Sequence, residues 1–254
     1  MAFALEIKDL KKVYGNGVEA LKGVTLEVPE GDFFALLGPN GAGKTTILGI
    51  STGLVNKTSG SVKVFGHDID QEPELAKTFI GLVGQEINFN PFEKIIDVVV
   101  NQGGYYGIPR AEAVPRAEML LRDLGLGDKM QSSGMQLSGG MKRRLMIARA
   151  LIHKPKFLIL DEPTAGVDVE LRRGMWDYLK KLTQEGLTIL LTTHYLEEAE
   201  QLAKHVAIIN KGTIIVNDTI DKVLSMHTES GEAKEGYRGS KLEEVFLSLI
   251  HENK

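Results

Sequence analysis

The chain has 254 residues, of which 43% are apolar and 25% are charged, a composition typical of one large globular domain or two small ones. Its net charge of -4 argues against a nucleic-acid-binding protein, since such proteins usually carry a basic face. The lack of cysteine excludes disulfides, thiolate metal sites and a cysteine nucleophile. No apolar run approaches the ~18 residues that span a bilayer, so we expect any membrane role to act through a partner chain.

The first quarter of the chain predicts strands on both sides of a glycine-rich loop. Residues 3–8 and 24–28 alternate between apolar and polar side chains, and so do residues 61–66. Between them, 33–37 is an apolar run typical of a buried strand, and 45–52 has the pattern of a helix. We therefore expect an antiparallel β-subdomain packed beside the core that carries the glycine-rich loop.

The loop itself, GPNGAGKT at 38–45, matches the pattern Gly-x4-Gly-Lys-Ser/Thr. Gly41 and Gly43 let bare backbone curl so that its amides surround an anion. Lys44 supplies a charge for the β- and γ-phosphates, and the hydroxyl of Thr45 can bind Mg²⁺. The helix behind the loop presents its positive end to the phosphates. A chance glycine-rich turn is the alternative, and the flanking strand and helix argue against it.

The remaining elements alternate between helix and strand, as in a parallel sheet with helices on both faces. Residues 86–145 read as an inserted helical subdomain, within which Pro115 is expected in the first turn of a helix and Met119, Leu120 and Leu124 on its apolar face. Elsewhere we expect helices at 73–78, 141–152, 169–183 and 196–203, and strands at 79–84, 157–161, 187–194 and twice within 206–216.

The chain is expected to form a single domain over 1–254 with a specialised end. The polar stretch 228–240 predicts a mobile linker. Residues 241–254 then form a helix expected to dock back on the domain, because four apolar side chains share one face: Leu242, Val245, Phe246 and Leu249.

Two carboxylates stand at the end of the apolar strand 157–161. Asp161 at a buried strand end is suited to accept a hydrogen bond from a Mg²⁺-bound water. Glu162 can accept a proton from an attacking water, and a general base contributes typically ~100- to 10,000-fold in rate. The alternative is an ordinary pair of acids at a strand end, which the phosphate loop upstream makes less attractive.

A second phosphate-binding feature precedes the helix 141–152. Ser138, Gly139 and Gly140 at a helix start offer a hydroxyl and free amides to an anion. Since the chain already has one phosphate loop, this feature makes sense if it serves a nucleotide held by another subunit. The alternative is an ordinary serine N-cap with a flexible glycine pair. The run Lys142-Arg143-Arg144 that follows predicts a mostly solvated face.

Together these motifs resemble the nucleotide-binding subunit of an ABC transporter. The resemblance rests on the phosphate loop, Gln85, LSGGM, FLILDE, Asp168 and His194, in that order, and covers almost the whole chain. SGGMKRRLMIARAL followed by LDEPTAGVD is similar in particular to type-2 ABC exporters, with Met141 where glutamine is commoner. The resemblance implies an α/β fold: a P-loop NTPase core with a mainly parallel sheet, an antiparallel β-subdomain and a helical subdomain.

The resemblance also implies a role for each motif. Tyr14 would stack on adenine, with an edge-strand core aromatic as the alternative. Gln85 would contact Mg²⁺ and the attacking water, alongside Thr45 and Asp161 as metal-site residues and Glu162 as base. His194 would contact the γ-phosphate, and Asp168 would lie at a dimer seam while also capping the next helix. The phosphates would be held by Gly38, Pro39, Asn40, Gly41, Ala42, Gly43, Lys44, Thr45 and Thr46. The partner subunit's ATP would be bound by Leu137, Ser138, Gly139, Gly140 and Met141.

The activity implied is ATP hydrolysis in a head-to-tail homodimer or heterodimer that drives separate transmembrane permease subunits at the cytoplasmic face of a membrane. An importer is the alternative direction. A soluble ABC-type ATPase acting on DNA or ribosomes is the alternative class, disfavoured because the stretch from Gln85 to Leu137 is too short for a long coiled coil and only one such domain is present. A kinase or small GTPase would have no use for LSGGM, and no nucleic-acid partner is expected.

Overall fold

A computed structural model describes residues 2–164, 169–229 and 240–252. The chain divides into two compact units. Unit 1 comprises residues 1–77 and 188–254, and unit 2 comprises residues 78–187. Within the described ranges, no helix combines the length and apolarity needed to cross a bilayer.

Unit 1 contains the expected antiparallel sheet, with strand order β2-β1-β4-β5. Its strands are β1 (Phe3–Val13), β2 (Glu19–Pro29), β4 (Ser59–Val64) and β5 (His67–Asp68). Buried and exposed residues alternate in the second half of β2, which places Val24, Leu26 and Val28 on one face. The alternation along β1 is interrupted by register shifts. Both strands extend well beyond the predicted ranges, because polar residues that break the alternation still pair in the ladder.

A second set of strands in unit 1 carries the glycine-rich loop. The order is β10-β9-β3-β8, with β3 (Phe33–Leu37) parallel to both β8 (Thr188–Thr192) and β9 (His205–Asn210). The edge strand β10 (Thr213–Thr219) is antiparallel to β9. All five residues of β3 and of β8 are buried, as their continuous apolar sequences predict.

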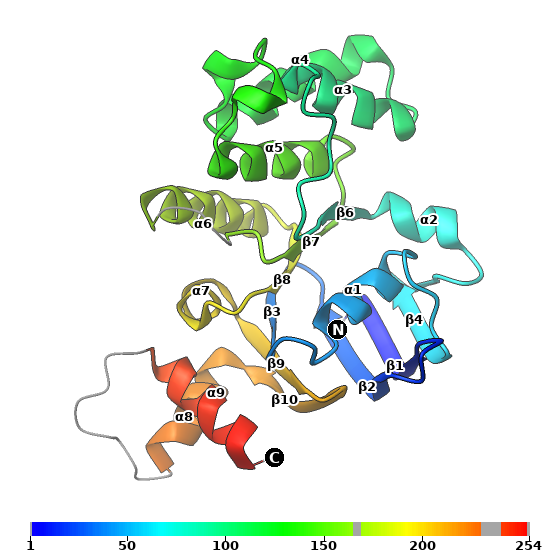
Figure 1. The fold of residues 1–254 in the computed structure, drawn as a ribbon, viewed down its shortest axis with the longest axis vertical. Coiled ribbons are helices and arrows are strands. Elements are labelled where there is room, and N and C mark those ends of the chain that lie inside the picture. Colours follow the sequence, from blue (N-terminus) through cyan, green and yellow to red (C-terminus); the bar gives the residue numbers. More distant parts are fainter. Residues whose placement is uncertain (1, 165–168, 230–239, 253–254) are drawn as a thin grey trace. The chain divides into compact units, whose positions relative to one another are not determined.

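The C-terminal helices of unit 1 cover part of this sheet. α8 (Ile220–Glu229) and α9 (Lys241–Glu252) lie side by side at the orange and red end of the chain (Figure 1). Leu242 and Val245 of α9 are buried in a cluster with β3, β9 and α7 (Leu196–Leu202), and Phe246 and Leu249 pack at its edge. The predicted linker 228–240 begins with the end of α8, and its residues 230–239 lie outside the described part of the chain.

Unit 2 combines a parallel strand pair with helices. β6 (Ile80–Val83) pairs with β7 (Phe157–Asp161), both highly apolar. Helices α3 (Ile95–Tyr105), α4 (Arg110–Asp123) and α5 (Gly139–Leu151) pack on one another. Two short 3₁₀ turns, η1 (Gly127–Lys129) and η2 (Gly134–Gln136), connect α4 to α5, and α6 (Val169–Gln184) follows β7. The remaining helices are α1 (Lys44–Ser51) in unit 1 and α2 (Pro73–Thr78) at the boundary.

Two details predicted for the helix that contains Pro115 are wrong. Pro115 lies inside α4, in its second turn, because the helix already begins at Arg110. Proline has no amide hydrogen, so the carbonyl of Ala111 lacks its helical partner there. Met119 is 52% exposed, whereas Leu120 and Leu124 are buried as expected. The buried face instead runs through Ala113, Ala117, Leu120 and Leu121.

The predicted α/β fold class is confirmed. Antiparallel and mainly parallel strands, and a helical block inserted between β6 and β7, are all present in the described residues. The strand-helix alternation after residue 157 is also as expected, each element ending within a few residues of its predicted limit.

Candidate functional site: a phosphate loop and a paired carboxylate

The glycine-rich loop follows β3 directly and leads into α1, whose first residue is Lys44. Gly43 caps the helix with a φ of 114°, and Gly41 has a φ of 77°, a region that suits glycine. A Cβ atom on Gly38 would lie 2.3 Å from the carbonyl oxygen of Ile209 in β9. Close packing against a neighbouring strand therefore requires glycine at the point where the loop leaves the sheet.

Lys44 lies at the centre of this loop. Its side chain is buried, and its ammonium donates hydrogen bonds to the carbonyls of Gly38 at 2.7 Å and Pro39 at 3.2 Å. Donors of this kind, a cationic head and the first amides of α1, match the chemistry of a phosphate group. The loop residues thus fit an ATP phosphate chain, with Thr45 exposed at the same helix start.

Tyr14 is tied to the same helix start from the loop between β1 and β2. Its hydroxyl is 3.2 Å from the hydroxyl of Thr46, and its ring lies 4.8 Å from the ammonium of Lys12. The side chain is 37% exposed, so the ring is available to a ligand rather than enclosed in the core.

His194 lies at the same edge of the sheet as the phosphate loop. Leu36 of β3 pairs with Thr192 of β8, so Gly38 and His194 each follow this pair by two residues. The carboxyl ends of parallel strands form the ligand-binding edge of α/β sheets. His194 is exposed, and its ring is 4.1 Å from that of Tyr195.

In unit 2 as well, a pair of parallel strands brings two residues to the same edge of the sheet, and these residues are predicted catalytic groups. Val83 of β6 pairs with Leu160 of β7, so Gln85 and Glu162 each follow the pair by two residues. The side-chain amide of Gln85 donates a hydrogen bond of 3.2 Å to the carboxylate of Glu162. Asp161, the last residue of β7, is buried.

Glu162 has an unusual backbone conformation. Its φ is 50°, in the left-handed region, which costs a residue with a Cβ about 1–2 kcal/mol. Residues held in strained backbone conformations cluster at functional sites, where the surroundings hold them. Here the turn after β7 places the carboxylate of Glu162 toward Gln85 instead of continuing the strand.

The LSGGM segment forms the beginning of α5. The hydroxyl of Ser138 accepts a hydrogen bond of 3.3 Å from the amide of Met141, so Ser138 is the N-cap of the helix. The first amides of a helix have no partner within it, and here these belong to Gly139 and Gly140. Leu137 is buried, whereas Ser138 and Gly139 are exposed. A helix start with an exposed serine hydroxyl and an exposed glycine suits an anion.

The sequence model of the ABC transporter family matches residues 21–165, more than half of the chain. The chain belongs to the ABC transporter family. Like the ATP-binding cassettes of this family, it is an ATPase subunit, and ATP is its nucleotide.

Curated ABC transporter proteins align over most of this chain. It is 42% identical to Nod factor export ATP-binding protein I of Cupriavidus metallidurans, over 84% of the chain and 70% of that protein. It is 40% identical to the linearmycin resistance ATP-binding protein LnrL of Bacillus subtilis (85% and 69% covered). The daunorubicin/doxorubicin resistance ATP-binding protein DrrA of Streptomyces peucetius is also 40% identical (87% and 67% covered).

Solved ABC transporter structures have the same fold. An ATP-binding subunit of an ABC transporter superposes with a TM-score of 0.84 at 28% identity, over 97% of this chain and 99% of that chain. A dimeric ATP-binding cassette in a post-hydrolysis state, bound to ADP and inorganic phosphate, gives a TM-score of 0.78 at 28% identity, with 85% and 98% covered.

One prediction about this ABC transporter subunit is wrong. Arg143, expected on a solvated face, is 6% exposed, and its guanidinium donates to the carbonyls of Gly84 and Gln85. The missed signal is its helical face: Arg143 shares that face with Gly140, Ile147 and Ala150, and all of them are buried. Asp168, expected at a dimer seam, lies outside the described residues.

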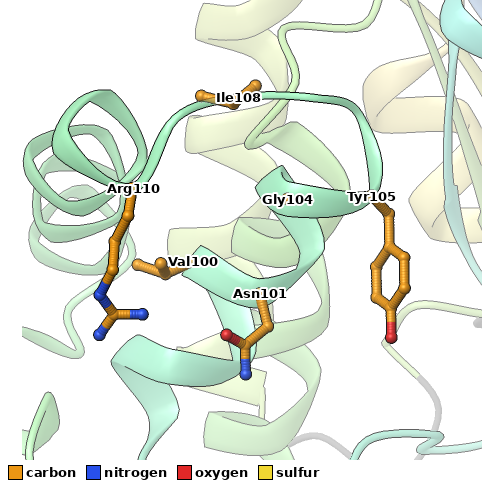
Figure 2. A pocket seen from close by; sticks show the side chains of 6 residues that line it. All are labelled: Val100, Asn101, Gly104, Tyr105, Ile108 and Arg110. Atoms are coloured by element: carbon orange, nitrogen blue, oxygen red, sulfur yellow. The ribbon is translucent and has the colours of Figure 1, made fainter.

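An open cavity of about 470 Å³ lies elsewhere in unit 2, between the end of α3 and the start of α4. Figure 2 shows its lining, in which the side chains of Asn101, Tyr105 and Arg110 are the polar members. None of the residues that line it belongs to the predicted ATP site.

Proposed function

We propose that this chain powers export, closing with a second subunit as a head-to-tail dimer around two ATP molecules. The observation that carries the proposal is the presence in one chain of two helix starts whose residues suit a phosphate group. α1 begins within the phosphate loop, and α5 begins at Ser138. A single ATP needs only one phosphate loop, so the exposed start of α5 is best explained by a nucleotide held in the partner subunit.

Export is favoured over import by the relatives. The proteins to which this chain is 40–42% identical are named for Nod factor export and for resistance to linearmycin and to daunorubicin/doxorubicin. Transport also requires a path across the membrane. We propose that this path is supplied by separate permease chains, which hold the ATPase at the cytoplasmic face.

The residues of the phosphate loop would bind the triphosphate before any chemistry occurs. Lys44 would exchange its carbonyl partners Gly38 and Pro39 for phosphate oxygens, a charge-assisted contact of greater strength. Tyr14 would stack on the adenine ring, and His194 would donate to the γ-phosphate. Ser138, Gly139 and Gly140 would bind the γ-phosphate of the partner's ATP, and Asp168 would lie at the seam.

Hydrolysis would depend on Glu162 and Gln85. Glu162 would remove a proton from the attacking water, and Gln85 would hold both the water and the carboxylate, using the amide that already contacts Glu162. Mg²⁺ when bound would neutralise charge on the phosphates. The hydroxyl of Thr45 and the carboxylate of Asp161 are the hard oxygen donors that this ion prefers. Closure of the dimer on ATP and its reopening after hydrolysis would drive conformational changes in the permease.

Substitution of Lys44 tests the nucleotide site. Lys44→Ala should abolish both high-affinity ATP binding and turnover, measured with a fluorescent nucleotide and by phosphate release. Parent-like hydrolysis by this variant would refute the phosphate-loop assignment. Purification of the tagged chain from detergent-solubilised membranes tests the transporter assignment. A multi-spanning membrane protein should co-elute, and elution of the chain alone from membranes that contain it would count against a permease partner.

A further inference from the structure

Arg143 makes contacts that ATP binding does not require. It lies in the second turn of α5, near the Ser138 cap, with a side chain that is almost fully buried. One guanidinium nitrogen donates to the carbonyl of Gly84 at 2.7 Å, and the other donates to the carbonyl of Gln85 at 2.8 Å. The planar fork of arginine can hold two adjacent carbonyls at once, which a single ammonium cannot do with the same geometry.

These two carbonyls belong to the segment that presents Gln85 to Glu162. Gly84 and Gln85 follow the last residue of β6, beyond the ladder that fixes the strand. The side chain of Gln85 is exposed, and its amide donates to Glu162. The backbone of Gln85 is therefore fixed on the α5 side by Arg143, while its side chain contacts the carboxylate on the β7 side.

The positive charge of Arg143 also interacts with the carboxylates of Asp161 and Glu162. Burial lowers the pKa of Arg143, and the negative charges of Asp161 and Glu162 oppose that lowering. A guanidinium remains protonated in proteins, so the buried group is a permanent cation beside the two carboxylates. A buried charge is costly unless it is hydrogen-bonded and near opposite charge, and both conditions are met.

We propose that Arg143 is a positioning residue for ATP hydrolysis: it ties the signature helix α5 to Gln85 and so holds Gln85 in place to orient Glu162. This inference rests on the proposed function of Glu162 as the base. It joins two parts that would serve different nucleotides, since Ser138 would contact the partner's ATP while Glu162 would act on the subunit's own. A movement of α5 would then shift Gln85 relative to Glu162.

Arg149 offers a matched control on the same helix. It also donates two hydrogen bonds, both to Asn88, at 2.8 Å to the carbonyl and 2.6 Å to the side-chain oxygen. Its burial likewise lowers its pKa. Arg149 therefore fastens α5 to the same connecting segment three residues beyond Gln85, without contacting the residues that present Gln85 to Glu162.

The experiment compares Arg143→Lys with Arg149→Lys in the full-length chain. We expect Arg143→Lys to lower kcat by about 10-fold or more, since small displacements of catalytic groups carry penalties of this order. The KM for ATP, the affinity for a fluorescent nucleotide and the fold should remain close to those of the parent protein. Arg149→Lys should keep kcat within about two-fold, because the contacts of Arg149 to Asn88 lie away from the residues that present Gln85 to Glu162.

A double variant separates positioning from general damage. If Arg143 acts through Gln85, then adding Arg143→Lys to Gln85→Ala should change kcat by less than about two-fold, because residues that act as a unit are not additive. An equal loss in both backgrounds, or parent-like kcat in Arg143→Lys, would overturn the proposal. If Arg143→Lys does not fold, Arg143→Gln takes its place in the same cycle, since it removes the buried charge.

Glu162→Gln is measured in parallel so that two failures can be told apart. Normal turnover in Glu162→Gln would refute the base assignment and, with it, the reason for positioning. Loss of turnover in Glu162→Gln together with normal kcat in Arg143→Lys would refute the role of Arg143 alone.

Discussion

Gln85 and Glu162 follow two paired strands at equivalent positions, and their side chains are joined by a 3.2 Å hydrogen bond. They are 77 residues apart in the chain, yet the parallel register of β6 and β7 places both two residues beyond the same pair. The register of the sheet, rather than proximity in sequence, thus brings an amide and a carboxylate together as a hydrogen-bonded pair.

Mixing two inactive subunits tests whether the signature segment acts across the dimer. We predict that Lys44→Ala and Gly140→Asp, each inactive alone, regain part of the parent ATPase rate when combined. A mixed dimer holds one site in which the phosphate loop and the opposing signature are both intact. The measurement is phosphate release across a range of mixing ratios. Absence of recovery while mixed dimers are shown to form would indicate that both motifs serve the same nucleotide.

Gly38→Ala should disturb the phosphate loop at the point where it leaves β3. The added methyl group would lie 2.3 Å from the carbonyl oxygen of Ile209, so either the loop or β9 must shift. Overpacking of this kind costs about 1–3 kcal/mol of stability, and nucleotide affinity should fall with it. Gly174→Ala in α6 is the control, because nothing lies within 4 Å of its added Cβ. Thermal unfolding and nucleotide titration of the two variants give the comparison, and equal behaviour would contradict the packing argument.

Docking of α9 contributes to the stability of unit 1. Leu242 is fully buried among residues of α7, β9 and α8, so Leu242→Ala should lower the free energy of unfolding by about 2–5 kcal/mol. Leu247, on the same helix, is 41% exposed, and Leu247→Ala should cost about 0.5 kcal/mol or less. Urea denaturation of both variants measures the difference. Similar small losses in both would mean that α9 adds little to the fold.

The motifs could be predicted because their signals are local. The phosphate loop, the strand ending in Asp161 and the segment before α5 each combine residue type, spacing and flanking pattern within about ten positions. The strand pairing that joins Gln85 to Glu162 was not visible in this way, because a register is set by packing across the whole sheet. The same holds for Asp32 and His205, which form a hydrogen-bonded pair across 173 positions.

Two predictions were wrong because tertiary packing outweighed a local sequence preference. A run of three basic residues usually faces solvent, but the buried face of α5 takes Arg143 inward to two backbone carbonyls that would otherwise need partners. Proline usually occupies a first helical turn, yet α4 tolerates Pro115 in its second turn. In both cases the packing of the helix, not the propensity of the residue, decides the outcome.

The most direct measurement is size-exclusion chromatography of Glu162→Gln with ATP and Mg²⁺, alongside its ATPase rate. The substitution keeps the size of the side chain and removes the base, so hydrolysis should fall by about 100- to 10,000-fold while ATP still binds. Because ATP binds the closed form and can no longer be turned over, the variant should elute as a dimer with ATP and as a monomer without it. Glu162→Gln combined with Lys44→Ala, at the same protein and ATP concentrations, should remain monomeric. Near-parent ATPase in Glu162→Gln, or an inactive variant that stays monomeric at saturating ATP, would contradict a base at Glu162 acting within a head-to-tail ATP sandwich.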